Sequence, residues 1–212
     1  MVLFLLLPFG SAMAQEWETL VKAESLHVER RPYKDSAIDE LRGTVQLEAS
    51  LNAIMALLRD APYNADWVHR SGGARIVAAN GYSQVYVYGI VDAPLPLMDR
   101  DTVVRFDYRQ DPDTRDILIE ITNFPDYLPE EAGLVRVPDF GGFWKLEPRE
   151  GGMVEVTYQV HGTAGGWVPV WLANYAAQLS VTRTLQNMPA AVERYSGLNS
   201  PHVQELDPLS AD

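Results

Sequence analysis

The chain has 212 residues, of which 47% are hydrophobic and 22% are charged. This composition suits a globular protein and excludes a disordered chain or a protein with many membrane spans. The formal net charge is −12 and no basic cluster occurs, which argues against binding of nucleic acid through its phosphates. Cysteine is absent, which excludes disulfides, thiolate catalysis and cysteine-ligated metal sites.

The first residues have the pattern of a secretory signal peptide. Val2–Phe9 is apolar, and Ala12-Met13-Ala14 has the A-x-A form of a signal-peptidase site. The apolar run is too short to span a bilayer as a helix. We therefore expect residues 1–14 to be cleaved after Ala14 and the protein to be periplasmic or secreted. No Lys or Arg precedes the apolar run, and a buried N-terminal helix or strand is the alternative.

Most of the remaining chain alternates between apolar and polar residues. This alternation predicts antiparallel strands with one face on a core. The predicted strands lie around 26–28, 45–47, 84–91, 101–109, 117–121 and 154–160. Pro112-Asp113 and Glu150-Gly151-Gly152 are typical of the turns that join two such strands into a hairpin.

Two segments have helical spacing instead. Ser50–Arg59 carries apolar residues three and four positions apart, with Ser50 as a suitable N-cap. Trp167–Val192 is a longer amphipathic segment with Pro169 near its first turn, and Pro189 should kink or end this helix.

These elements predict one α+β domain over residues 15–195, followed by a tail or peripheral wrap over 196–212. A curved antiparallel sheet around a long C-terminal helix is a helix-grip fold, and a cavity forms wherever helix and sheet do not interdigitate.

Four motifs, in a fixed order, resemble those of the START (steroidogenic acute regulatory protein-related lipid-transfer) domains in the helix-grip superfamily. They are Asp99-Arg100-Asp101, then Asp126-Tyr127-Leu128-Pro129 with Gly133-Leu134-Val135-Arg136, then Gly142-Phe143-Trp144-Lys145-Leu146, and Gly165-Gly166-Trp167-Val168-Pro169 running into Trp171-Leu172-Ala173-Asn174. The resemblance covers Trp17 to Tyr195. It implies an internal hydrophobic cavity that holds one lipid, with the C-terminal helix and a neighbouring loop as its gate.

The candidate ligand-binding residues are mostly aromatic and lie in the segments that would line this cavity. An apolar ring with a polar tip suits a ligand that is mainly hydrocarbon with few oxygens. The candidates are Tyr86, Tyr88, Arg100, Phe106, Tyr108, Ile121, Trp144, Tyr158, Trp171, Leu172, Tyr175 and Leu179. Any single aromatic residue among them is more often part of the core, so the group indicates a lipid cavity only together with the resemblance.

Arg100 shares the alternation of Val104, Phe106 and Tyr108, which places it on the apolar face of its strand. A buried guanidinium needs an acceptor, and the resemblance implies that Arg100 makes a polar contact at the end of the cavity. The alternative is that Arg100, as the first residue of the strand, turns out to solvent. Alternation puts Asp101 on the opposite face, which we expect to be wet.

A lipid can enter a closed cavity only if a part of the protein moves. The loop Asn123–Gly133 contains Pro125 and Pro129 and lies beside the presumed mouth. Gly165-Gly166 precedes the long helix and could act as its hinge. We expect this loop and the long helix, moving about its hinge, to form the gate.

Three hypotheses about function follow. The first is an exported, monomeric protein that binds a lipid or sterol-like molecule and shuttles or presents it, with transient membrane contact. The second is a cyclase-like helix-grip enzyme acting on a hydrophobic aromatic or polyketide-type substrate. The third is a binding module with a collapsed pocket that works through protein contacts. No G-x-S-x-G, P-loop, G-x-G-x-x-G or H-E-x-x-H motif occurs, so we expect no catalytic residue, cofactor or metal site.

Overall fold

A sheet of ten strands dominates the structure, a computed structural model that describes residues 16–34 and 36–206. The predicted signal peptide therefore lies outside the described residues. The strands are β1 (Glu18–Lys22), β2 (Leu26–Arg31), β3 (Glu40–Glu48), β4 (Ser71–Asn80), β5 (Gln84–Val91), β6 (Arg100–Gln110), β7 (Ile117–Asn123), β8 (Val135–Arg136), β9 (Phe140–Arg149) and β10 (Met153–Gly162). Their order is β1-β2-β3-β10-β9-β7-β6-β5-β4, all antiparallel, and β8 pairs with β6 in parallel.

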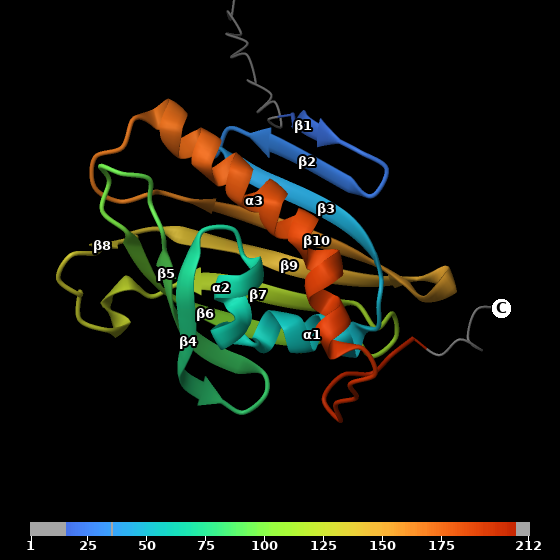
Figure 1. The fold of residues 1–212 in the computed structure, drawn as a ribbon. Coiled ribbons are helices and arrows are strands. Elements are labelled where there is room, and N and C mark those ends of the chain that lie inside the picture. Colours follow the sequence, from blue (N-terminus) through green and yellow to red (C-terminus); the bar gives the residue numbers. More distant parts are fainter. Residues whose placement is uncertain (1–15, 35, 207–212) are drawn as a thin grey trace, which may run out of the picture.

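Three α-helices, α1 (Leu51–Arg59), α2 (Asn64–Trp67) and α3 (Val170–Val192), lie on one face of this sheet (Figure 1). The curved sheet around the C-terminal helix confirms the predicted helix-grip fold. Ser50 is the N-cap of α1, as predicted, and its Oγ accepts a hydrogen bond from Ala53 N at 3.1 Å. Within the described part of the chain, no helix is both long and apolar enough to cross a membrane.

The sequence predicts that Pro189 kinks or ends the long helix. Helix α3 continues through it to Val192, so the second of these alternatives is wrong. Pro189 faces solvent, while Met188 and Val192 beside it are buried in the core. Packing of these neighbours holds the backbone helical although the proline removes one internal hydrogen bond.

The C-terminal half of α3 lies close to β3 because Gly43 has no side chain. A Cβ atom at Gly43 would overlap the Leu185 side chain and lie 3.0 Å from Val181 Cγ1. The N-terminal half is packed more loosely, since Ala173 is the one buried residue between Val170 and Ser180. The helix is thus anchored at its C-terminal half.

The segment after α3 wraps around the beginning of α1. The Glu205 carboxylate accepts hydrogen bonds from the backbone N–H groups of Leu51, at 3.0 Å, and Asn52, at 2.8 Å. These are amides that a helix N-terminus leaves without internal partners. Val203 is buried, so residues 196–206 form a peripheral wrap rather than a free tail.

Candidate functional site

A cavity of about 140 Å³ lies between the sheet and the helices. Strands β6, β7, β9 and β10 form its floor, and α1, α2 and α3 cover it. The lining residues are Leu58, Asn64, Trp67, Val68, Phe106, Tyr108, Ile119, Ile121, Phe140, Trp144, Tyr158, Ser180 and Thr184. The cavity therefore lies where the helix-grip fold predicts one, between α3 and the sheet.

Five of the predicted ligand-binding residues line this cavity: Phe106, Tyr108, Ile121, Trp144 and Tyr158. Trp144 and Tyr158 are directly opposite each other on β9 and β10, and their rings stack with centroids 3.8 Å apart. That these five residues contact a ligand remains a prediction.

Tyr86 and Tyr88, two of the predicted lining residues, do not line the cavity, because they lie on the other face of β5. Their neighbours Val85 and Val87 are buried in the core, and alternation turns the two tyrosines to the other side of the sheet. There Tyr86 stacks on Tyr127 with centroids 4.5 Å apart. Burial raises the pKa of Tyr88 to about 12.

The four predicted residues at the start of α3 also lie outside the cavity. Trp171 is 71% exposed and Tyr175 is 58% exposed, while Leu172 and Leu179 are half-buried and do not line it. The buried stripe of α3 instead includes Ala173, about 200° around the helix from Trp171 and Tyr175.

Arg100 is buried, so the alternative that it faces solvent is wrong, but it does not line the cavity. Its Nε donates to the backbone carbonyl of Ala164 at 3.2 Å, and its Nη1 donates to that of Met98. Arg100 therefore links the β5–β6 loop to the β10–α3 loop.

Asp101 is buried, so the prediction that it lies on a wet face is wrong. Its carboxylate accepts from Arg136 Nε at 3.0 Å and from Nη2 at 2.8 Å, and both side chains are at most 5% exposed. This contact raises the pKa of Arg136. The carbonyls of Pro125, Leu128 and Pro129 accept from the remaining guanidinium N–H groups. All five donors of Arg136 are therefore engaged, and they hold the predicted gate loop against the sheet.

Several polar groups at the cavity were not predicted. The indole Nε1 of Trp67 is buried and has no hydrogen-bond partner among the described residues. Ser180 and Thr184, one turn apart on α3, also line the cavity, and Thr184 Oγ1 accepts from His69 N at 3.1 Å. Two hydroxyl residues one helical turn apart, within an otherwise apolar stripe, are a sequence signal that could have identified them.

Two phenols at the cavity are held in the neutral form. Burial raises the pKa of Tyr108 to about 12, and burial raises the pKa of Tyr158 further. Both hydroxyl groups are therefore protonated at neutral pH and can donate a hydrogen bond.

The cavity is small for its predicted ligand. Pockets that enclose drug-sized molecules are about 300–1,000 Å³, and a lipid needs at least as much space. Lipid binding therefore requires the cavity to expand. The N-terminal half of α3 is a candidate for this movement, because Ala173 is its one buried residue.

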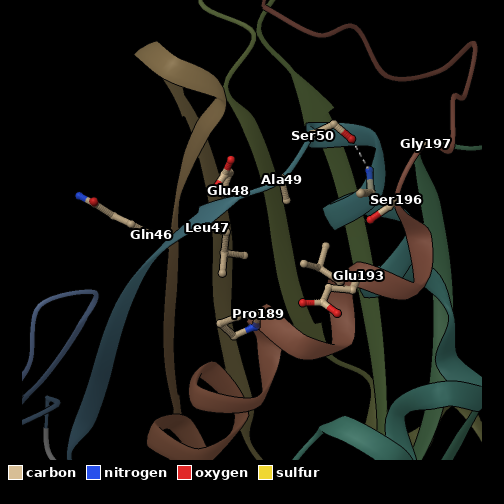
Figure 2. Close-up of a pocket in the computed structure, with 11 residues that line it drawn as sticks. Gln46, Leu47, Glu48, Ala49, Ser50, Pro189, Glu193, Ser196 and Gly197 are labelled. Atoms are coloured by element: carbon tan, nitrogen blue, oxygen red, sulfur yellow. Dashed lines mark hydrogen bonds between the residues drawn. The ribbon is translucent and has the colours of Figure 1, made fainter.

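A larger hollow of about 470 Å³ lies at the C-terminal end of α3 (Figure 2). It is a surface groove between the β3–α1 connection and the end of α3, and exposed polar residues such as Gln46, Glu48 and Glu193 line it. The groove lacks the apolar enclosure that a lipid needs, so the cavity beneath α3 is the candidate site.

Comparison with known proteins agrees with this geometry. The chain is 30% identical over 185 residues to an uncharacterized protein of Pseudomonas aeruginosa, covering 87% of this chain and 91% of that relative. It is 27% identical over 187 residues to the phosphatidylcholine transfer protein of Rattus norvegicus, covering 85% of each. No protein-family model matches the chain.

Solved structures with the same fold include a STAR-related lipid transfer protein (fragment 25–204) from Xanthomonas axonopodis. That structure has a TM-score of 0.77 and 32% sequence identity, and the match covers 84% of this chain and 98% of that one. Human StAR-related lipid transfer protein 5 has a TM-score of 0.75 at 17% identity, over 86% of this chain and 88% of that one, and shares the fold.

Proposed function

The chain belongs to the START family of lipid-transfer domains, and from this premise we propose that it binds one lipid in the cavity beneath α3 and shuttles or presents it outside the cytoplasm. The observation that carries the proposal is the aromatic cavity between α3 and the sheet. Apolar lining favours hydrocarbon by about 0.8 kcal/mol for each buried CH₂ group. The lipid-transfer names of two relatives support the same function.

Mass spectrometry of organic extracts from the purified full chain tests this proposal. We expect one lipid per protein molecule, and we expect the protein to move that lipid between donor and acceptor vesicles. A chemically modified small molecule in place of a lipid would favour the cyclase-like enzyme. A protein that is empty and stays empty after incubation with vesicles would favour the module with a collapsed pocket.

Transient membrane contact is the second part of the proposal. Four large side chains at the start of α3 form what we term the aromatic patch: Trp167 (82% exposed), Val170 (48%), Trp171 (71%) and Tyr175 (58%). Trp and Tyr are the residues that favour the interface between water and lipid headgroups. The patch lies on the loosely packed half of α3, where a lipid could pass directly between the membrane and the cavity.

Export is the third part of the proposal, and it is supported by the apolar run that ends at Ala12-Met13-Ala14. N-terminal sequencing of the protein from its native host should give Gln15 as the first residue. Retention of Met1 would contradict export by this signal.

A further inference from the structure

Tyr108 lines the cavity and also belongs to a stack of side chains that reaches the C-terminal wrap. The Arg59 guanidinium lies over the Tyr108 ring, 4.4 Å from its centroid, and over the Tyr82 ring, 3.9 Å from its centroid. Arg59 Nη1 also donates to the Tyr82 carbonyl at 2.9 Å. Arg59 is not among the residues that line the cavity, so it can affect a bound lipid only through those that do.

The stack ends on the wrap at His202. Tyr82 lies in the turn between β4 and β5, and the His202 ring stacks on it with centroids 4.3 Å apart. The same turn holds the backbone of Tyr108, whose N–H donates to the Ser83 carbonyl at 2.7 Å. We term His202, Tyr82, Arg59 and Tyr108 the stacked column. It connects the wrap, which does not line the cavity, to a residue that does.

A second connection joins the wrap to the same strand. Gln110 follows Tyr108 by two positions on β6, so both side chains lie on the same face. The Gln110 Oε1 accepts from Gln204 N at 2.9 Å, and its Nε2 donates to the Gln204 carbonyl at 2.7 Å. Val203, the preceding residue of the wrap, is buried in the core. The wrap is therefore fixed to the sheet close to Tyr108.

A side chain that is already held in place loses little further freedom when a ligand packs against it. Tyr108 is buried, and its ring is held by the cation–π contact with Arg59. If that contact is lost, the ligand itself must order the ring, and ordering one side chain lowers affinity by about two- to tenfold. The contact of Arg59 with Tyr108 therefore bears on how tightly a lipid binds.

We propose that Arg59 is a positioning residue for lipid binding, which holds the Tyr108 ring in the cavity wall and is itself held by the wrap through Tyr82. This inference rests on the proposed lipid-binding function. It adds that residues 196–206, which lie outside the cavity, respond to whether the cavity is filled. Such a coupling is reciprocal, so a wrap that strengthens lipid binding is in turn stabilised by the bound lipid.

Hydrogen exchange of the wrap amides, followed by mass spectrometry, tests this coupling in the full chain. The protein is stripped of lipid and then loaded from vesicles of phosphatidylcholine, phosphatidylethanolamine and phosphatidylglycerol. Native mass spectrometry at a series of vesicle concentrations measures the fraction of protein loaded. We expect loading to slow exchange in residues 196–206 by about two- to tenfold, the range for ordering one side chain.

The variant Arg59→Met keeps an unbranched side chain and removes the guanidinium. We expect it to bind lipid about two- to tenfold more weakly, and we expect loading no longer to slow exchange in its wrap. The control Arg109→Met changes an exposed residue that follows Tyr108 on β6 and points to the opposite face. This control should match the wild type in both measurements.

Wrap exchange that loading leaves unchanged in the wild type would overturn the proposed coupling. The same holds if the wrap of Arg59→Met exchanges faster by an equal factor in the empty and the loaded protein, because a purely structural contact has that effect. A wild-type protein that retains no lipid would instead contradict the lipid-binding function on which the proposal rests.

Should Arg59→Met fail to fold, His202→Ala decides the question, because His202 is exposed at the far end of the stacked column. Its loss should reduce the effect of loading on wrap exchange. A wild-type effect of loading in His202→Ala would show that the stacked column does not carry the coupling.

Discussion

The buried ion pair between Asp101 and Arg136 shows how one side chain can hold a whole loop. Arg136 satisfies the carboxylate and three backbone carbonyls of residues 125–129 at once. Removing the guanidinium leaves a buried charge and three carbonyls without their donor. Such a loss costs far more than the intact pair contributes against a neutral substitute.

We expect Arg136→Met to lower the free energy of unfolding by about 3–5 kcal/mol, as found when one partner of a buried pair is removed. Urea denaturation followed by circular dichroism measures this loss. The control is Arg109→Met, which breaks an exposed ion pair with Glu120 and should cost less than about 1 kcal/mol. Equal losses in the two variants would show that Arg136 does not hold the loop.

His69 gives the stability a dependence on pH. Burial lowers its pKa in the folded protein, and the charges of Arg70 and Arg183 lower it further. Well above about pH 6.5, His69 is neutral in both the folded and the unfolded protein, so it contributes no pH dependence. As the pH falls below that value, the unfolded chain takes up the proton first, and the folded state loses stability until its own lower pKa is passed.

The variant His69→Gln should therefore lose less stability than the wild type between about pH 7.5 and about pH 5.5. Urea denaturation at both pH values measures the difference. The exposed histidine in His202→Gln serves as the control, and this variant should keep the wild-type dependence. A His69→Gln curve parallel to the wild type would show that His69 is not the group responsible.

Residue by residue, the sequence predicts the cavity only where one face of a strand is clearly polar. On β6, alternation with charged residues identifies Phe106 and Tyr108 correctly. On β5, both faces are apolar, because the loop after β7 covers the outer face with Phe124 and Tyr127. Alternation cannot tell the two faces apart there, so Tyr86 is predicted to line the cavity although it lies on the outer face.

At the scale of elements, β6, β7 and β10 are well predicted, but edge strands and the phase of α3 are not. Strand β4 begins Ser-Gly-Gly-Ala, is interrupted by two register shifts and has no buried residue, so it lacks the alternation of a core strand. On α3 the buried stripe contains small and hydroxyl residues such as Ala173, Ala177 and Thr184. The larger residues Trp171 and Tyr175 give a stronger apolar signal from the exposed side.

A proline substitution at Gly165 would not test the hinge expected before α3. Gly165 has a φ of +66°, whereas proline requires about −65°. A Cβ atom there would also lie 2.9 Å from the Arg136 carbonyl oxygen. Gly165→Pro would therefore disturb the fold of the loop before it reported on the motion of α3.

Asn174 offers a cleaner test of helix motion, because it fastens the loosely packed half of α3 to the segment before β3. Its Oδ1 accepts from Asp39 N at 2.9 Å, and its Nδ2 donates to the Ala37 carbonyl at 3.2 Å. We expect Asn174→Ala to speed lipid exchange between vesicles by up to about tenfold, with a smaller change in equilibrium affinity.

Fluorescence transfer between donor and acceptor vesicles measures the exchange rate. The control Arg183→Ala changes an exposed residue on the anchored half of the same helix and should exchange lipid at the wild-type rate. An unchanged rate in Asn174→Ala would place the gate elsewhere, for instance in the loop held by Arg136.

At the scale of the whole molecule, most of the exposed apolar side chains lie near the N-terminal end of α3. Beside the aromatic patch, the β5–β6 loop exposes Leu95 (94%) and Met98 (56%). Arg100 ties this loop to the one that leads into α3, because it donates to the carbonyls of Met98 and Ala164. The two loops therefore lie next to each other. With a net charge of −12, attraction to anionic headgroups cannot be the main driving force for membrane contact.

Insertion of apolar side chains leaves a different experimental signature from electrostatic binding. We expect the double variant Trp167→Ser/Trp171→Ser to bind phosphatidylcholine vesicles at least about tenfold more weakly than the wild type, because each fully buried large apolar side chain is worth about 1.5–3 kcal/mol. Its melting temperature should not fall, since both side chains are already exposed in the folded protein.

Vesicle sedimentation at low and high salt measures the affinity of the protein for the vesicles, and this affinity should change little with salt. The control Leu198→Ser removes a 51% exposed side chain after the other end of α3 and should bind vesicles normally. Equal weakening by the control, or loss of wild-type binding in high salt, would contradict docking through the aromatic patch.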